Sequence, residues 1–447
     1  MNSLNNPSHK KLGLWMLTAL VAGNMIGSGI FLLPSSLAQI GSISLFSWIF
    51  TTAGALVLAL MFARLSMQIP KTGGPYAYTK VGLGKFLGFQ TAYNYWITIW
   101  VGNAAIVIAL IGYTSVFIPI LSEPKIACIA AIAVIWFLTL VNLLGVQFAG
   151  MLQLVTTILK LIPILLIGLF GWHYAHPGYF HQYFNITSPP QSNFLAISNG
   201  AALTFWSFIG LESATVPAEA VNNPTRTIPL ATIIGTLIAA AGYILSSSAI
   251  MNMMPAPVLQ HSVAPFAEAG QIIFGPIGKD IITLGAIISC FGCLNGWILL
   301  QGQVVLGAAE DNLFPKIFAQ KNRHQIPAAG LIITSALVTL LLFLTISPNL
   351  VSQFQVIILL AVLSALIPYF YTAIAEIVIL TREKNRKISF LIKLIIAILA
   401  AIYSCWAIIG TGEQILYYGC LLLLSSVPIY AWCTKFKSVE EKNLNVN

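Results

Sequence analysis

Residues 23–29 read Gly-Asn-Met-Ile-Gly-Ser-Gly and lie within residues 12–63, a stretch without Asp, Glu, Lys or Arg. About 18 apolar residues suffice for a helix to cross a bilayer, so this stretch is long enough for two passes. Irregular backbone inside a membrane is tolerated only where it lines a cavity. Three glycines in the middle of a span therefore indicate either an interrupted helix or a face of small residues for helix packing.

The rest of the 447-residue chain has the same character: 58% of it is hydrophobic and 7% is charged. A soluble domain has roughly 25% charged residues. Seven further stretches without charge are 126–159, 161–211, 227–267, 281–309, 324–375, 394–412 and 414–434. This composition predicts an all-α polytopic membrane protein. It excludes a soluble enzyme, a nucleic-acid-binding protein and an outer-membrane barrel, whose strands alternate polar and apolar residues.

Breaks at Gly, Pro and charged residues divide the chain into twelve predicted transmembrane helices. They lie near residues 13–36, 43–68, 86–118, 126–146, 149–172, 196–218, 227–252, 276–307, 328–346, 353–379, 389–410 and 414–434. Residues 1–12 and 435–447 are predicted to be the terminal tails.

The basic residues are distributed unevenly among the predicted loops. With the N-terminus inside, eighteen of the 21 Lys and Arg residues fall on the cytoplasmic side. Lys125 and Lys279 fall outside, and Lys160 lies within the fifth span. This bias follows the positive-inside rule and predicts a multi-pass protein of the bacterial inner membrane with both termini in the cytoplasm. Anionic lipid headgroups on the cytoplasmic side are then a sufficient partner for the net charge of +9. We therefore predict no nucleic-acid partner.

A second interruption is predicted in the sixth span, at Trp206-Ser207-Phe208-Ile209-Gly210-Leu211-Glu212-Ser213. Spans one and six hold corresponding positions if spans 1–5 and 6–10 are repeats. Interrupted helices at such positions indicate a transporter's substrate site near the midplane. Opened N–H groups at 27–29 are suited to a carboxylate, and freed carbonyls of 206–210 to an ammonium group.

Two charged residues lie deep in the predicted spans. Glu212 adjoins the second interruption, and a carboxylate in the bilayer is functional by default; the alternative is a neutral, hydrogen-bonded structural Glu. Lys160 lies too far from its span's end for easy snorkelling. It is a candidate proton carrier or a fixed substitute for a sodium ion, or else a structural partner.

The remaining chemistry-bearing residues predict neither a metal site nor an enzyme. Cys290 and Cys293 form a CxxC in an apolar helix, and the three histidines at 173, 176 and 181 have no metal-binding spacing. We therefore predict no metal and no cofactor, and the spans hold no nucleophile–base pair. Trp206 and Trp297 are candidates to stack on a cationic substrate.

These features together resemble the amino acid–polyamine–organocation transporter superfamily. Four stretches carry the resemblance: 23–31 with Pro34, 70–78 with Gly84 and Gly88, 206–214 with Asn223-Pro224, and 309–315. Tyr95-Trp96, Gly102-Asn103, Gly296-Trp297 and Pro368-Tyr369 make the chain most similar to the arginine/agmatine antiporter branch.

The resemblance implies a 5+5 inverted repeat (LeuT-like) at 13–172 and 196–379, with broken helices 1 and 6 and two extra helices at 389–434. It implies an amino acid or amine substrate, and related exchangers pair as homodimers. The substrate-binding residues that we expect by position are Asn24, Ile26, Gly27, Ser28, Gly29, Thr98, Asn103, Trp206, Ser207, Ile209, Trp297 and Ala361. The residues expected in gating or proton coupling are Tyr95, Glu212, Tyr369 and Lys160.

The chain departs from the arginine/agmatine branch at Ile99, Ile106 and Ala361, where that branch has more polar or sulfur-containing residues. It also departs at Lys160, where that branch has an apolar residue. Proton-coupled members elsewhere in the superfamily have a Lys at that position. We therefore expect an antiporter that exchanges an arginine-like cationic amino acid for its amine or another amino acid by alternating access. The alternative is a proton-coupled symporter of broader or neutral specificity that uses Lys160.

Overall fold

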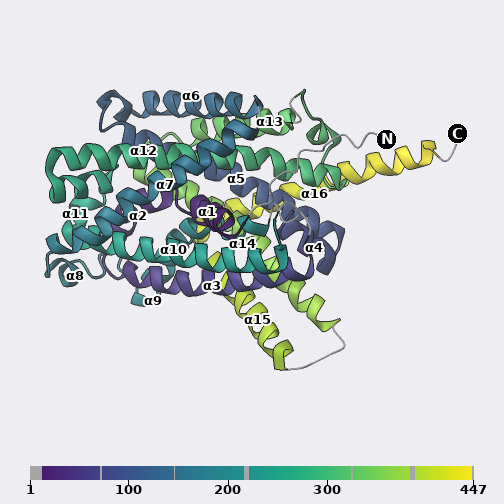
Figure 1. The fold of residues 1–447 in the computed structure, drawn as a ribbon, viewed down its shortest axis with the longest axis horizontal. Coiled ribbons are helices and arrows are strands. Elements are labelled where there is room, and N and C mark those ends of the chain that lie inside the picture. The colour runs from purple at the N-terminus through teal and green to yellow at the C-terminus, as the bar shows by residue number, and fades with distance from the viewer. Residues whose placement is uncertain are drawn as a thin grey trace, which may run out of the picture.

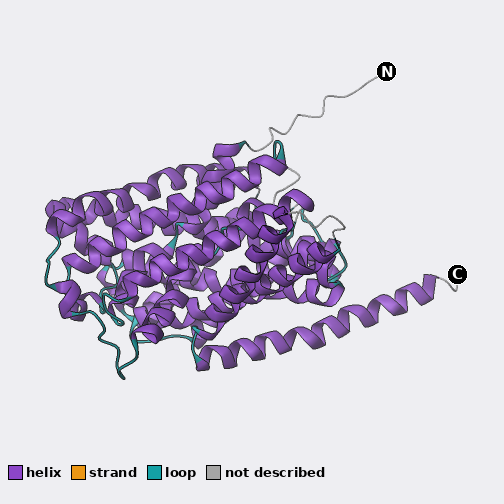
Figure 2. Ribbon diagram, turned by 90° about the horizontal axis from the view of Figure 1, so that it is seen from below, coloured by secondary structure: helices purple, strands orange, loops and turns teal. Residues whose placement is uncertain are grey.

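The computed structural model describes residues 13–70, 73–144, 146–215, 221–323, 326–382 and 388–444. These residues form a bundle of α-helices joined by short loops and 3₁₀ turns, and no strand occurs among them (Figures 1 and 2). The predicted N-terminal tail, residues 1–12, lies outside the described residues. So do residues 71–72 of the 70–78 motif and the last three residues of the predicted C-terminal tail.

The first half of the bundle contains α1 (Leu14–Met25), α2 (Ser28–Ala38), α3 (Ser44–Gln68), α4 (Pro75–Leu83), α5 (Lys85–Thr114), α6 (Pro124–Leu143), α7 (Val146–Phe170) and α8 (Tyr179–Gln182). The second half contains α9 (Asn193–Phe205), α10 (Pro224–Met253), α11 (Ala256–Leu259), α12 (Pro265–Glu310), α13 (Ala328–Leu344), α14 (Leu350–Thr381), α15 (Ile388–Ile409) and α16 (Glu413–Leu444).

Helix length and composition agree with a multi-pass membrane protein. Within the described residues, 10 helices are long and apolar enough to cross a membrane, and two shorter apolar helices lie at Leu159–Tyr174 and Ala328–Leu344. Each of the predicted spans overlaps one of these segments. The exact number of passes and the inverted repeat remain predictions.

Two boundaries differ from the prediction for identifiable reasons. Helix α12 begins at Pro265, before the predicted start at 276, because two helices meet at a kink where Gly275 has φ 70° and ψ −159°. Glycine adopts positive φ without the steric cost that a side chain brings. Helix α16 continues to Leu444, so residues 435–444 of the predicted tail are helical.

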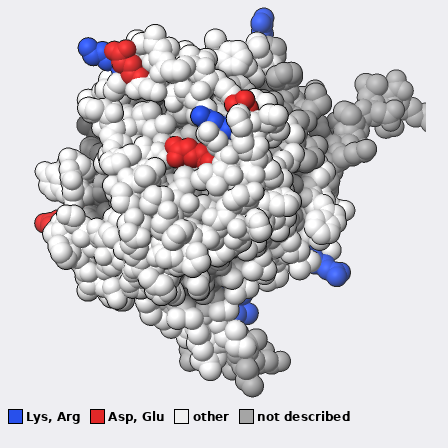
Figure 3. Space-filling view, turned by 90° about the vertical axis from the view of Figure 1, so that its left-hand side faces the viewer, with Lys and Arg blue, Asp and Glu red and all other residues white. Residues whose placement is uncertain are grey.

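The two ends of the bundle differ in structure (Figure 1). One end, which we call the α4 end, carries α4 and the projecting C-terminal part of α16. The opposite end, the α8 end, carries α8 and α11. The α8 end presents few charged side chains on a largely uncharged surface (Figure 3). The positive-inside prediction assigns the α4 end to the cytoplasm.

The outside of the bundle is apolar, as a lipid-facing surface requires. Large hydrophobic side chains are well exposed on α6, such as Leu140 (59%), and on α15, such as Ile402 (59%). An exposed apolar surface of this extent marks contact with a membrane or another protein. Helix α5, by contrast, is buried along almost its whole length and forms the centre of the bundle.

Helices α5 and α12 run antiparallel. Near the end of α5, Tyr113 Oη accepts a hydrogen bond from the backbone N–H of Phe266 at the start of α12 (3.2 Å). Near the start of α5, the ring of Phe89 lies 5.6 Å from the ring of Phe314, a residue just beyond the end of α12. Towards the α4 end, residue numbers therefore fall along α5 and rise along α12.

Candidate functional site

The first predicted interruption is present between α1 and α2. Helix α1 ends at Met25, Ile26 is extended with φ −78° and ψ 92°, and Gly27 has φ −138° and ψ −138° before α2 begins at Ser28. A Cβ atom on Gly27 would lie 2.5 Å from Sγ of Cys293. A side chain at position 27 would therefore collide with α12, which explains the glycine.

The second predicted interruption follows α9. A 3₁₀ turn, Trp206–Phe208, is succeeded by extended Ile209 and by Gly210, which has φ 111°. Another 3₁₀ turn, Ser213–Thr215, comes next. Few side chains tolerate that positive φ, and a Cβ atom on Gly210 would also lie 3.2 Å from Cβ of Asn24. The glycine thus permits both the turn and the close approach to the first interruption.

The two interruptions are in direct contact. Asn24 donates from Nδ2 to Oγ of Ser213 (2.9 Å), and Trp206 donates from Nε1 to Oγ of Ser28 (3.4 Å). Non-helical backbone at this depth is tolerated only beside a cavity, and these contacts place the two non-helical segments side by side.

A small cavity lies between the interruptions. Seven of the predicted substrate-binding residues line it: Asn24, Gly27, Ser28, Gly29, Trp206, Ile209 and Trp297. Met25, Ile106 and Cys293 complete the lining. The cavity thus combines N–H groups at the start of α2, a suitable anion site, with two indole rings.

The other five predicted residues are buried but do not line this cavity. Ile26 uses its backbone carbonyl in another contact, described below. Thr98 donates to the Asn94 carbonyl of its own helix (3.0 Å). Asn103 bonds a neighbouring helix, Ser207 accepts at its backbone carbonyl from Tyr243 Oη (2.9 Å), and Ala361 lies within α14.

Glu212 lies between the two 3₁₀ turns of the second interruption and is fully buried. Its Oε1 accepts from Oη of Tyr95 (2.6 Å), and its Oε2 accepts from Oη of Tyr369 and from the backbone N–H of Gly210 (3.2 Å). Within the described residues, Glu212 has no ion pair. The structure therefore brings three of the four predicted gating residues into one cluster.

Lys160, the fourth, lies apart from that cluster. It is fully buried and donates from Nζ to the backbone carbonyls of Gly23 (2.7 Å) and Ile26 (3.0 Å). Both carbonyls belong to the first interruption, where the helical pattern of hydrogen bonds is broken. Lys160 therefore supplies two hydrogen-bond donors to the opened backbone.

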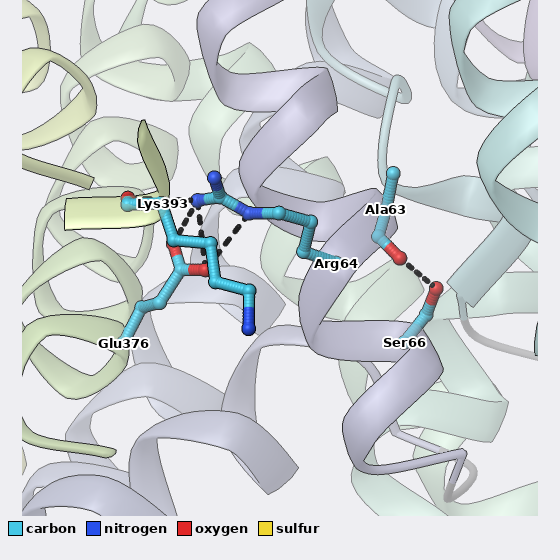
Figure 4. Close-up of polar contacts among 5 residues, drawn as sticks. All are labelled: Ala63, Arg64, Ser66, Glu376 and Lys393. Carbon is cyan, nitrogen blue, oxygen red and sulfur yellow. Dashed lines mark hydrogen bonds and ion pairs between the residues drawn. The ribbon is translucent and has the colours of Figure 1, made fainter. Parts of the chain in front are cut away.

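Charged residues at the α4 end are paired instead. Arg64 on α3 donates to both carboxylate oxygens of Glu376 on α14, at 2.8 and 2.9 Å, and to the Lys393 carbonyl on α15 at 3.2 Å (Figure 4). Lys80 on α4 bonds Asp311 at the end of α12 (2.7 Å). These contacts connect α3 to α14 and α15, and α4 to the end of α12.

A tyrosine on α4 lies beside this charged region. Burial and the nearby carboxylates of Asp311 and Glu310 raise the pKa of Tyr76 to about 12, because both effects disfavour the phenolate. Tyr76 therefore remains neutral at physiological pH.

Sequence reasoning missed Met25 and Cys293 as cavity-lining residues. Helical spacing offered one signal, since Cys293 precedes Trp297 by four residues and so shares its face of α12. Sequence reasoning also missed Gln301 on α12, whose side chain accepts a hydrogen bond from Asn103 on α5. Nothing local in the sequence indicates that contact.

Two interrupted helices in contact around a cavity, within a bundle of membrane-spanning helices, define the class: a polytopic membrane transporter. The chain belongs to the amino acid permease family, whose model matches residues 12–417. It is 36% identical over 411 residues to the cadaverine/lysine antiporter of Escherichia coli K12, with 91% of each chain covered. It is 35% identical over 423 residues to the putrescine transporter PotE of Haemophilus influenzae, covering 94% of this chain and 97% of that one.

Proposed function

We propose that this protein is a secondary active antiporter of the bacterial inner membrane that exchanges a cationic amino acid for an amine or another amino acid by alternating access. The observation that carries the proposal is the cavity between the two interruptions. Its N–H groups at 27–29 suit a carboxylate, the carbonyls near Ile209 suit an α-ammonium, and Trp206 and Trp297 offer faces that attract a cation.

The relatives support a basic substrate. Their names specify lysine, cadaverine and putrescine, which share a chain that ends in a primary amine. Ile106 lines the cavity, and neither Ile99 nor Ala361, both buried, offers a hydrogen-bonding side chain. A guanidinium has five N–H donors, and each one left unpaired costs about 1–3 kcal/mol. We therefore place lysine-like substrates ahead of the arginine-like substrate expected from the sequence.

The test is exchange in proteoliposomes. Uptake of labelled lysine and labelled arginine is followed with the lumen empty or loaded with lysine, cadaverine, putrescine, arginine, agmatine or leucine. We expect uptake only into vesicles loaded with a cationic compound. Uptake that is indifferent to luminal contents contradicts antiport. The Trp206→Ala variant should lose affinity for the cationic substrates; unchanged affinity would show that the cavity is not the site.

Lys160 favours a second candidate function, proton-coupled symport. Its Nζ contacts the opened backbone of the first interruption directly, so a change in its protonation would be felt at the site. Uptake into empty vesicles driven by an inward proton gradient, and lost in Lys160→Ala, is the result that would replace exchange with symport.

A further inference from the structure

A buried chain of polar side chains leads away from Asn103 through three neighbouring helices. Asn103 on α5 donates from Nδ2 to Oε1 of Gln301 on α12 (2.8 Å). Gln301 donates from Nε2 to Oγ of Ser335 on α13 (3.1 Å) and to the Leu331 carbonyl (3.4 Å). Ser335 in turn shares a 2.7 Å hydrogen bond with Thr139 on α6. All four side chains are 0–1% exposed.

The far end of the chain determines its direction. Thr139 donates its only hydroxyl hydrogen to the Ile135 carbonyl (2.7 Å), so Ser335 must donate to Thr139 and can only accept from Gln301. The Leu331 carbonyl also only accepts. Both contacts require the NH₂ group of Gln301, and its Oε1 must therefore face Asn103.

The orientation of Gln301 then imposes one on Asn103. Because Oε1 of Gln301 can only accept, Asn103 must turn its NH₂ group towards Gln301. The Oδ1 atom of Asn103 then points away from Gln301. Within the described residues, Oδ1 is buried and has no hydrogen-bond donor. A buried acceptor without a donor is unfavourable, and a ligand that brings an N–H group would relieve it.

The amide pair lies next to the cavity. Asn103 precedes Ile106 by three residues on α5, and Gln301 follows Trp297 by four residues on α12; Ile106 and Trp297 both line the cavity. Residues three or four apart share a helix face. Because α5 and α12 are antiparallel, both amides lie one turn beyond the cavity in the same direction, towards the α4 end.

We propose that Gln301 is a positioning residue that selects substrates with a terminal ammonium group. By engaging the NH₂ group of Asn103, it leaves a carbonyl oxygen one turn beyond the cavity, where the far end of a bound substrate would reach it. This oxygen accepts a hydrogen bond from an ammonium and offers nothing to a methyl group. The inference rests on the proposed function, since it assigns the distal end of that substrate site.

The experiment compares lysine with norleucine, which has the same chain length but ends in a methyl group. Apparent KM and maximal rate for lysine, and the inhibition constant of norleucine, are measured in proteoliposomes for the unaltered protein and Gln301→Leu. In Gln301→Leu the Asn103 amide is free to rotate. We expect the preference for lysine over norleucine to fall about tenfold, the effect of losing one hydrogen bond to a charged group, through KM with little change in maximal rate.

Three further variants make the test specific. Gln301→Glu should retain the preference, because a neutral carboxylic acid reproduces one acceptor and one donor, and an ionised one remains an acceptor. Ser335→Ala removes one anchor of Gln301 and should lower the preference less than Gln301→Leu does. Gln353→Leu is the matched control: Gln353, near the start of α14, is also buried but bonds Thr345, the residue that follows α13 (3.3 Å). Its loss should leave the preference unchanged.

The outcomes separate this inference from the proposed function. A preference within about twofold of the original in Gln301→Leu would overturn the positioning role, while exchange itself stands. If Gln301→Leu does not fold, an unchanged preference in Ser335→Ala together with a lost preference in Gln301→Glu overturns it. Absence of lysine exchange in the unaltered protein would instead overturn the proposed function.

Discussion

Two regions of the molecule bury charged groups in opposite ways. At the α4 end, Glu376 is 1% exposed and receives three hydrogen bonds from Arg64. In the middle of the bundle, Glu212 is bonded by two phenols and one backbone N–H, and Lys160 by two carbonyls. Within the described residues, neither has a counter-ion.

The difference separates structural from functional charges. A buried ion pair holds its partners together, and removing one member leaves an uncompensated charge. A buried charge with only neutral partners has no counter-ion to offset the loss of its hydration and is costly in a membrane. We therefore interpret Arg64 and Glu376 as a connection between α3 and α14, and Glu212 and Lys160 as groups whose charge is used in transport.

The largest effect is expected at Lys160. Lys160→Ala removes two charge-assisted hydrogen bonds from the opened backbone of the first interruption. At about 1.5–3 kcal/mol each, their loss should lower the exchange rate at least about 100-fold. The measurement is lysine exchange in proteoliposomes at matched protein density.

Lys279→Ala is the control for this variant, because Lys279 lies in α12 near its kink and bonds no part of the interruptions in the contacts described. It should exchange normally. Normal exchange in Lys160→Ala would show that the cation at the interruption is dispensable, and would place Lys160 with the structural charges.

The next effect concerns Glu212. Glu212→Gln keeps the shape of the side chain but removes its charge and its ability to titrate. We expect a fall of about tenfold in exchange rate, equivalent to about 1.4 kcal/mol, and a flat pH profile. The pH dependence of exchange is measured from acidic to neutral conditions for both proteins.

Glu376→Gln sharpens this comparison, since it alters a buried carboxylate that already has a cation. Its pH profile should follow that of the unaltered protein. If the Glu212→Gln profile also keeps its shape, Glu212 has a structural role and the contrast between the two regions fails.

The third effect is on stability. Arg64→Met or Glu376→Leu alone leaves a buried charge unpaired and should lower the free energy of unfolding by about 3 kcal/mol. The double variant replaces both charges with apolar groups and should recover most of that loss. Thermal unfolding in detergent, with lysine exchange measured in parallel, tests this expectation. Additive losses in the double variant would mean that the pair is not coupled.

The sequence predicts the fold better than the site. Charge-free stretches and glycines predict the helices and both interruptions, because bilayer thickness and backbone hydrogen bonding constrain them directly. Gln301 could not be predicted, since its partner Asn103 is 198 positions away and the contact depends on how α5 and α12 pack. The carbonyl partners of Lys160 could not be predicted either, because every residue type has a backbone carbonyl.

The smallest effect is expected at the exposed pair of Lys321 and Glu310, whose side chains are 36% and 54% exposed and lie 2.9 Å apart. Water and salt screen such a pair, and exposed pairs contribute about 0–1 kcal/mol. A double-mutant cycle with Lys321→Gln and Glu310→Gln should therefore give a coupling energy well below that of Arg64 and Glu376, and one that shrinks as salt is added. Equal coupling energies for the two pairs would show that burial does not determine how much an ion pair at the α4 end contributes to stability.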